Sequence, residues 1–164
     1  MECRVQVARL EDVAAIAEIY GFSVMHSTAT FELEPPGVEE MERRLVAVQQ
    51  GGLPYFVAES DGVVVGYGYA SQFRPRAGYR FTVEDSIYVR AEYAGRGVGR
   101  RLLTTLVEAC RAAGFKQMVA VMGGENPASV ALHAQQGFAP VGVLRRVGFK
   151  FDAWQDVTLM QRAL

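Results

Sequence analysis

The chain has 164 residues, of which 50% are hydrophobic and 21% are charged, a composition typical of a folded globular protein rather than a disordered one. Its formal net charge of −1 gives no general attraction to nucleic acid or to anionic lipid, so we expect neither as a partner. No apolar run approaches the ~20 residues of a membrane span, and the start of the chain lacks the apolar stretch of a signal peptide, so we expect a cytoplasmic protein.

The two cysteines form no recognisable motif. Cys3 and Cys110 do not make a CxxC pair, and no histidine lies at a spacing that suits a metal. Cys110 continues an apolar helical series with Leu103, Leu106 and Val107, which predicts a buried small hydrophobe rather than a reactive thiol. We therefore expect no metal site and no acyl-cysteine intermediate.

Strand-like and helix-like patterns alternate along the chain, without a linker or a repeat. This alternation predicts α/β or α+β packing around one sheet, in a single domain of residues 1–164. In the first half the pattern predicts, in chain order, strand 3–7, helix 13–20, a helix that begins at 38 and ends before Gly51, and strands 55–59 and 63–70. The Asp61-Gly62 pair between the last two strands is a strong signal for a hairpin turn.

The second half begins with a polar loop, Phe73-Arg-Pro-Arg-Ala-Gly-Tyr-Arg80. The elements predicted after it are strand 81–89, a glycine-rich turn, helix 98–113, strand 118–122, a helix that Asn126 caps and Gly137 ends, and final strands 138–143 and 157–161.

The most informative segment is the glycine-rich turn. Gly95, Gly97 and Gly99 let the backbone adopt positive φ and approach a ligand closely. The helix that follows leaves N–H groups unpaired at the positive end of its dipole, and Arg96 and Arg100 add positive charge. Together these features predict a site for a phosphate or pyrophosphate, although a tight turn without a ligand could contain the same glycines.

A dinucleotide-binding turn is the alternative reading of these glycines. That fingerprint is G-x-G-x-x-G in a first βαβ unit, with an acidic residue about 20 residues later. Here the spacing differs, the turn lies past the midpoint of the chain, and position 119 is Val. The sequence also contains no G-x-x-x-x-G-K-[ST] phosphate loop.

The turn resembles the pyrophosphate motif of the GNAT acetyltransferase superfamily, R/Q-x-x-G-x-G/A. The matching stretch is Ala94-Gly-Arg-Gly-Val-Gly99, in which Ala94 stands where Arg or Gln is usual. A second stretch, 126–138, resembles the family's N-x-x-[SA]-x-x-[LF]-Y-x-x-x-G-F, with His133 in place of Tyr. The blocks that resemble the phosphinothricin / methionine sulfone N-acetyltransferase branch are 27–32, 73–80, 82–89 and 148–156.

This resemblance implies a GNAT fold, in which helices flank a central mixed, mostly antiparallel seven-stranded sheet that splits near Val89. It implies acetyl-CoA as the donor, a small amino-acid-like amine as the acceptor, and a homodimer. The acetyl group would pass directly from acetyl-CoA to the amine. The alternatives are a GNAT enzyme that acts on another amine, such as a protein N-terminus or a polyamine, and a non-catalytic acyl-CoA-binding module.

Acetyl transfer to an amine needs a base, because an ammonium group has no lone pair. Glu84 lies in a strand between Val83 and Ile87, where partial burial would raise its pKa. From the sequence alone a solvated or ion-paired carboxylate is an equal alternative, and the resemblance favours Glu84 as the base. For His133 the resemblance implies that it protonates the leaving thiolate or relays the amine proton, whereas a lone histidine is more often structural.

The resemblance also implies two sets of binding residues. The cofactor set is Ile87, Tyr88, Val89, Gly95, Arg96, Gly97, Val98, Gly99, Arg100, Asn126 and Ser129. Within it, backbone N–H groups around Tyr88 and Val89 would stabilise the charge on the thioester oxygen. The acceptor set is Phe31, Arg74, Arg76, Tyr79 and Glu84, where arginine suits a carboxylate or phosphinate. Lys150 and Trp154 belong either to this acceptor pocket or to packing.

Overall fold

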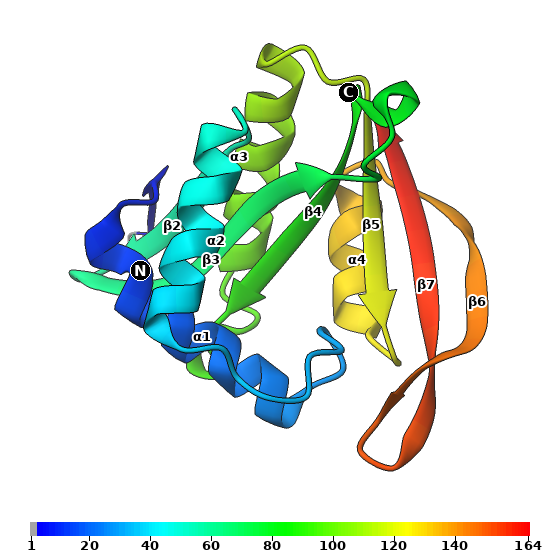
Figure 1. Ribbon diagram of the computed structural model, residues 1–164, viewed down its shortest axis with the longest axis horizontal. Coiled ribbons are helices and arrows are strands. Elements are labelled where there is room, and N and C mark those ends of the chain that lie inside the picture. Colours follow the sequence, from blue (N-terminus) through cyan, green and yellow to red (C-terminus); the bar gives the residue numbers. More distant parts are fainter. Residues whose placement is uncertain (1–2) are drawn as a thin grey trace.

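A computed structural model describes residues 3–164 and has one mixed sheet flanked by helices (Figure 1). The strands are β1 (Arg4–Val7), β2 (Tyr55–Ser60), β3 (Val63–Gln72), β4 (Thr82–Val89), β5 (Gln117–Gly123), β6 (Ala139–Lys150) and β7 (Ala153–Ala163). Their order in the sheet is β1-β2-β3-β4-β5-β7-β6. Only the pair β4–β5 is parallel, so the predicted seven-stranded, mostly antiparallel sheet is confirmed.

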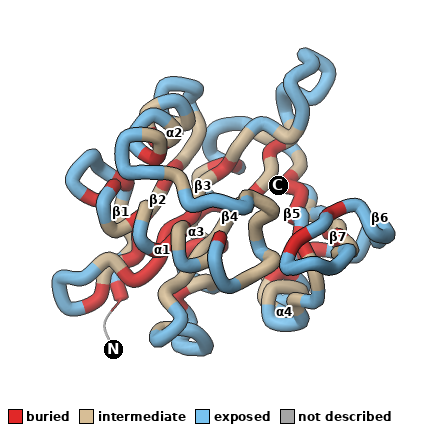
Figure 2. Tube along the Cα trace, turned by 60° about the horizontal axis from the view of Figure 1, so that its bottom comes forward, coloured by how far each residue is buried: buried red, intermediate tan, exposed pale blue. Residues whose placement is uncertain are grey.

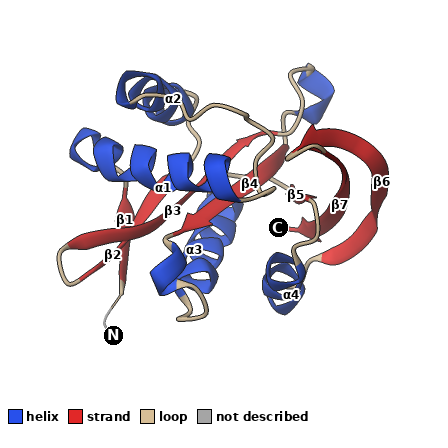
Figure 3. Ribbon diagram, turned by 90° about the horizontal axis from the view of Figure 1, so that it is seen from below, coloured by secondary structure: helices blue, strands red, loops and turns tan. Residues whose placement is uncertain are grey.

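Helices cover both faces of the sheet (Figure 3). The longer helices are α1 (Val13–His26), α2 (Val38–Gln50), α3 (Val98–Ala112) and α4 (Pro127–Gln135). The first two lie on one face, over a core that includes Tyr67, and the other two lie on the opposite face, over a core that includes Met118. None of these helices is both long enough and apolar enough to cross a membrane.

The side chains of β4 alternate between these two cores. Val83 and Ile87 pack in the core beneath α3, whereas Tyr88 packs in the core beneath α1 and α2. Because successive side chains of a strand point to opposite faces, odd-numbered residues of β4 face α3 and α4. Even-numbered residues face α1 and α2. This alternation decides on which side of the sheet each candidate site residue lies.

The sheet splits between β4 and β5. The two strands pair only from Thr82 to Asp85, opposite Gln117 to Ala120, although β4 continues to Val89. The strands diverge beyond these pairs, as can be followed in Figure 1. A split is therefore present. It begins at residue 86, a few residues before Val89, near which the family resemblance had placed it.

Several predicted elements are shorter than the observed ones. The helix predicted at 13–20 extends to His26, and the strands predicted at 138–143 and 157–161 are the longer β6 and β7. These two strands form a curved hairpin at one end of the sheet (Figure 3). Most of β6 is exposed (Figure 2), because it is the edge strand and no helix covers it.

Candidate active site

Hydrogen bonds at the two ends of β4 show which of its backbone groups point toward β3 and which point toward β5. The Arg90 N–H donates to the Val65 carbonyl at 2.9 Å, on the side of β3. The Phe81 carbonyl accepts from the Lys116 N–H at 2.8 Å, on the side of β5. The register of β4 against β3 contains no irregularity, and backbone groups alternate sides along a strand. Even-numbered residues of β4 therefore bond to β3, and odd-numbered residues direct their N–H and carbonyl groups toward β5.

Ile87 and Val89 consequently direct their backbone N–H groups into the split, where β5 no longer pairs with them. Tyr88 directs its own backbone groups to β3 and lies opposite Tyr67. The expectation that Tyr88 supplies a backbone donor to the thioester is therefore corrected to Ile87. A free strand edge of this kind can hydrogen bond to an extended ligand.

The start of α3 lies just after this edge. Gly97 is its N-cap residue, with φ of 83°, and no side chain caps the first N–H groups of the helix. Gly95 also has positive φ, and a Cβ at either glycine would meet no protein atom within 4 Å. Both positions thus require glycine for backbone conformation, and the space beside them is open to a phosphate.

Gly99 has a different reason to lack a side chain. A Cβ there would lie 3.3 Å from Leu132 Cδ2, so this glycine allows α3 to pack closely against α4. Arg96 and Arg100 are exposed beside the turn, and the Arg96 guanidinium lies 5.3 Å from the centre of the Tyr93 ring. Both arginines are free to approach a pyrophosphate, while Ala94 supplies no polar side chain.

Glu84 lies on the face covered by α1 and α2, as an even-numbered residue of β4. Burial and then the negative charge of the neighbouring Asp85 raise the pKa of the Glu84 carboxyl, and the positive charge of Arg74 acts against them. A carboxyl group with a raised pKa accepts a proton more readily than an ordinary glutamate. The environment of Glu84 thus suits a general base.

His133 of α4 lies on the other face of the sheet, where it pairs with Asp85. Its Nε2 is 2.9 Å from Asp85 Oδ2, and its Nδ1 is 2.7 Å from the Ser129 carbonyl oxygen. Both side chains of the pair are buried. Burial alone would lower the pKa of His133, but the hydrogen bond and charge of Asp85, with the Ser129 carbonyl, outweigh it and raise the pKa.

The two predicted catalytic residues therefore lie on opposite faces of β4. Both ring nitrogens of His133 have partners, so neither is free to donate directly to a thiolate. Asp85, which the sequence reasoning missed, is the residue that engages His133. The signal was available: Asp85 alternates with the apolar Val83 and Ile87, and an acidic side chain on an apolar face of a strand needs a partner.

The exposed loop after β3 carries Arg74, Arg76 and Tyr79. The positive charge of Arg74 acts on Glu84, while its guanidinium lies 4.4 Å from the centre of the Phe73 ring. Tyr79 packs edge-on against the same Phe73 ring. The structure therefore brings Arg74 toward the candidate base, and Arg76 makes no such contact among the described residues.

The Phe31 ring packs closely against two strands at positions where glycine leaves room for it. A Cβ at Gly123, the last residue of β5, would lie 2.9 Å from the Phe31 ring, and a Cβ at Gly148 of β6 would overlap it. The buried Lys150 donates from Nζ to the Thr30 carbonyl at 2.8 Å and so anchors the same loop. Lys150 is thus buried against the loop that carries Phe31, and Trp154 is exposed on the β6–β7 hairpin.

Asn126 caps α4, because its Oδ1 accepts from the Ser129 N–H at 3.1 Å. Its side-chain amide nitrogen is not needed for the cap and can serve a ligand. The Ser129 hydroxyl lies 3.3 Å from His133 Nδ1, which links the start of α4 to the buried pair. Asn126 and Ser129 therefore both lie at the start of α4, on the face of the sheet that α3 also covers.

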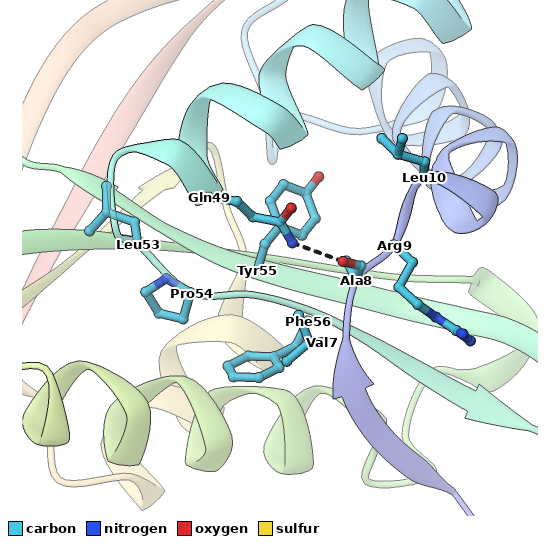
Figure 4. Close-up of a pocket in the computed structure, with 9 residues that line it drawn as sticks. All are labelled: Val7, Ala8, Arg9, Leu10, Gln49, Leu53, Pro54, Tyr55 and Phe56. Atoms are coloured by element: carbon cyan, nitrogen blue, oxygen red, sulfur yellow. Dashed lines mark hydrogen bonds between the residues drawn. The ribbon is translucent and has the colours of Figure 1, made fainter.

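Three further observations concern the described residues outside this site. A hollow of about 600 Å³ lies between the end of β1, the end of α2 and the start of β2 (Figure 4), and Arg9 is its only charged lining residue. Among residues 3–164 no group of three or more His, Cys, Asp or Glu side chains could hold a metal ion. Burial raises the pKa of the Cys110 thiol to about 12, which makes it a poor nucleophile.

A sheet that splits beside a free strand edge, with a glycine-started helix next to the split, suits a ligand that has both an extended chain and a phosphate group. Residues 17–138 match the acetyltransferase (GNAT) family. The chain is 49% identical to a phosphinothricin N-acetyltransferase of Alcaligenes faecalis over 163 residues, which are 99% of this chain and 83% of that protein. It is 38% identical to an L-methionine sulfoximine/L-methionine sulfone acetyltransferase of Salmonella typhimurium, over 98% of this chain and 94% of that one.

The fold is also similar to a crystal structure of a GNAT superfamily phosphinothricin acetyltransferase from Sinorhizobium meliloti in complex with acetyl-CoA. The TM-score is 0.98 at 46% identity, covering 100% of this chain and 89% of the other. The chain belongs to the GNAT acetyltransferase family. This finding confirms the family predicted from the sequence and its donor, acetyl-CoA.

Proposed function

We propose that the protein, as a single domain, transfers the acetyl group of acetyl-CoA to the amino group of a small amino-acid-like acceptor. The observation that carries the proposal is the position of Glu84, whose pKa is raised: it lies three and five residues before Ile87 and Val89, whose backbone N–H groups form the free strand edge in the split. The names of the relatives support acceptors of the phosphinothricin, methionine sulfone and methionine sulfoximine type.

In the proposed reaction the acceptor nitrogen attacks the thioester carbonyl carbon directly. Glu84 accepts the proton that the amine loses, either directly or through one water molecule. The backbone N–H groups of Ile87 and Val89 stabilise the charge that develops on the thioester oxygen, which can contribute several kcal/mol. The C–S bond then breaks, the thiolate of CoA departs, and the amide product forms without an acyl-enzyme.

The cofactor is held at the start of α3. The N–H groups after Gly97 bind the pyrophosphate at the positive end of the helix dipole, and Arg96 and Arg100 add charge. Asn126 contributes its side-chain amide to the pantetheine part. His133 acts through Asp85 as a positioning residue beneath β4, because both of its ring nitrogens are engaged.

We also propose that the protein works in the cytoplasm, where acetyl-CoA is available, as a homodimer joined through the β6–β7 hairpin. The exposed apolar side chains of that hairpin are Val141, Val143, Leu144, Val147, Phe149, Phe151 and Trp154. An exposed edge strand with this composition is a site for association. Light scattering should give a dimer mass for the wild type and a monomer mass for Val147→Lys. A matched change at an exposed valine of β3, Val63→Lys, should leave the dimer mass unchanged.

The function is tested by measuring acetyl-CoA consumption with a panel of amines. The panel contains amino acids, their oxidised derivatives, phosphinothricin, polyamines and peptides. We expect turnover with the oxidised methionine derivatives or phosphinothricin, and little with polyamines, because Arg74 and Arg76 would repel a cation. Turnover with peptides or polyamines alone would reject the proposed acceptor class. Acetyl-CoA binding without turnover of any amine would favour a non-catalytic acyl-CoA-binding module.

A further inference from the structure

The hydroxyl group of Ser129 connects the buried His133–Asp85 pair to the accessible start of α4. Ser129 lies one helical turn before His133, and its Oγ is 3.3 Å from His133 Nδ1. The side chain of Ser129 is half-buried, whereas His133 and Asp85 are buried. A ligand beside α4 can therefore reach the serine hydroxyl but neither member of the pair.

The hydrogen bonds of His133 determine in which direction this hydroxyl group can donate. The Ser129 carbonyl oxygen can only accept, so its 2.7 Å contact with His133 Nδ1 requires a proton on Nδ1. The same N–H lies next to Ser129 Oγ, which therefore accepts rather than donates at this contact. Among residues 3–164 the hydroxyl group has no other partner. Its own proton is thus available to a ligand.

His133 also places positive charge beside this donor. Burial lowers the pKa of His133, but the hydrogen bond and charge of Asp85, with the Ser129 carbonyl, outweigh burial and raise the pKa. Hydrogen bonds in a chain polarise one another, so a hydroxyl group that accepts from a protonated imidazole donates more strongly through its own O–H. Ser129 is therefore suited to a partner that becomes negatively charged.

The helix α4 runs beside the split in the sheet. It begins just after β5 ends, and near its other end His133 reaches Asp85, the last residue of β4 that pairs with β5. Between these points α4 touches the free strand edge, because a Cβ at Gly99 would lie 3.3 Å from Leu132 Cδ2 and 3.9 Å from Ile87 Cγ2. The helix therefore extends from the open end of the split to the point at which β4 and β5 separate.

This geometry places Ser129 level with the backbone N–H of Ile87. From His133 to Ser129 the helix rises by about 6 Å toward the open end of the split. From Asp85 to Ile87 the strand advances by about 7 Å in the same direction. Residues four apart share one face of a helix, so Ser129 faces β4 as His133 does.

We propose that Ser129 is a further catalytic residue, whose hydroxyl group donates a hydrogen bond to the thioester sulfur of acetyl-CoA as the C–S bond breaks. This rests on the proposed function, in which the thioester oxygen binds to the N–H groups of Ile87 and Val89. The sulfur keeps the electron pair of the C–S bond and leaves as a thiolate, which water protonates later. His133 positions the serine, because its Nδ1–H holds Oγ as an acceptor and leaves the O–H for the sulfur.

The first measurement compares Ser129→Ala with the wild type, using an amine that the wild type acetylates. Losing one hydrogen bond to a charged group should lower kcat roughly 10- to 100-fold. The KM for acetyl-CoA should hardly change, because an uncharged sulfur is a weak acceptor. Ser129→Thr keeps a hydroxyl group and should retain most of kcat. Thr105→Ala is the matched control, since the hydroxyl it removes already donates to the Arg101 carbonyl at 3.0 Å, and it should leave kcat unchanged.

The second measurement follows the thiol group of bound CoA and needs no acceptor. The ultraviolet absorbance of the thiolate is measured against pH, and the complex with desulfo-CoA, which lacks the sulfur, gives the background from tyrosines. The thiol should ionise at a pH about one to two units higher in Ser129→Ala than in the wild type, because the variant loses a hydrogen bond to the thiolate.

Unchanged kcat in folded Ser129→Ala, or ionisation of the bound thiol at the same pH in both proteins, would overturn the role of Ser129. A large rise in the KM for acetyl-CoA at unchanged kcat would also overturn it, since Ser129 would then only bind the cofactor. If the wild type acetylates no amine, the proposed function is rejected, and the thiol titration alone decides whether Ser129 contacts the sulfur.

Discussion

Glu84 and Asp85 are consecutive residues of β4 whose side chains lie on opposite faces of the sheet. Glu84 is half-buried beneath α1 and α2 and has no ion-pair partner within 4 Å among residues 3–164. Asp85 is buried on the other face and is paired with His133. The strand thus separates a carboxyl group that is available to a substrate from one that is fixed in a buried pair.

The first prediction concerns proton transfer. Glu84→Gln keeps the shape of the side chain but removes its basicity, so kcat should fall by roughly 10²–10⁴. The KM for acetyl-CoA should stay within a few-fold. In the wild type, activity should decline as the pH falls through the raised pKa of Glu84, and this limb should be absent from Glu84→Gln. Nearly full activity at neutral pH with the limb intact would show that Glu84 is not the base.

The second prediction concerns the stability of that same variant. The folded-state pKa of Glu84 is above its unfolded value, so its ionised form destabilises the folded protein at neutral pH. Glu84→Gln should therefore melt at a higher temperature than the wild type at pH 7. This gain should disappear as the pH falls below the unfolded pKa of about 4.3, where both forms are uncharged. A lower melting temperature at pH 7 would contradict the environment described for Glu84.

The third prediction concerns the buried pair. His133→Gln leaves Asp85 buried without an ionic partner, which should lower the free energy of unfolding by about 3–5 kcal/mol. Because the folded pKa of His133 is raised, its stabilising effect is complete below about pH 6.5 and is lost as the pH rises through that folded pKa. Denaturant unfolding at pH 6 and pH 9 should give a larger difference between wild type and variant at pH 6. An equal difference at both values would mean that the pair does not depend on the imidazolium.

Much of the fold could be predicted from local signals. The Asp61-Gly62 turn is present, with φ of 52° and 78°, and Asn126 caps its helix. The lengths of β6 and β7 could not be predicted, because the ladder between them shifts register between Leu144 and Gly148. Arg146 adopts positive φ in that interval, so the alternation of apolar residues that marks a strand is interrupted.

The site was only partly predictable for a similar reason. Glycine spacing and the order of strand, turn and helix predicted the uncapped start of α3 with its open glycines, since local geometry determines it. The arrangement of the face that carries Glu84 depends on which residues of β2, β3 and α1 meet in space, and no local pattern indicates that Tyr55, Tyr67 and Tyr69 share one cavity. The partner of His133 lies 48 positions earlier in the chain, which only the folded structure reveals.

The fourth prediction tests the cofactor cradle. Gly97→Val should weaken acetyl-CoA binding strongly, because it strains a residue with φ of 83° and fills the space in which a phosphate would lie. Gly114→Val is a matched control. Gly114 follows the other end of α3, has φ of 92° and is equally open, so the variant suffers similar strain away from the cradle. Calorimetry should show weakened binding for Gly97→Val alone. Similar affinities for the two folded variants would reject the pyrophosphate assignment.

The fifth prediction concerns recognition of the acceptor's carboxylate. Arg74→Ala should raise the KM for the amino acid roughly 10- to 100-fold, as expected for the loss of one charged hydrogen bond. The KM for acetyl-CoA should hardly change. Arg80→Ala is a control on the same loop, since the Arg80 guanidinium bonds to the Ala77 carbonyl. An equal loss with a decarboxylated analogue of the acceptor would show that Arg74 does not bind the carboxylate.

The short parallel pairing of β4 with β5 has a thermodynamic consequence for the protein in the cell. Four residue pairs join the part of the sheet that contains β1–β4 to the part that contains β5–β7. A ligand that enters the split binds the folded chain and not the unfolded one, so it adds to stability by mass action. At one hundred times its dissociation constant, the added stability is about 2.7 kcal/mol. The supply of acetyl-CoA would then set the lifetime of the enzyme as well as its rate.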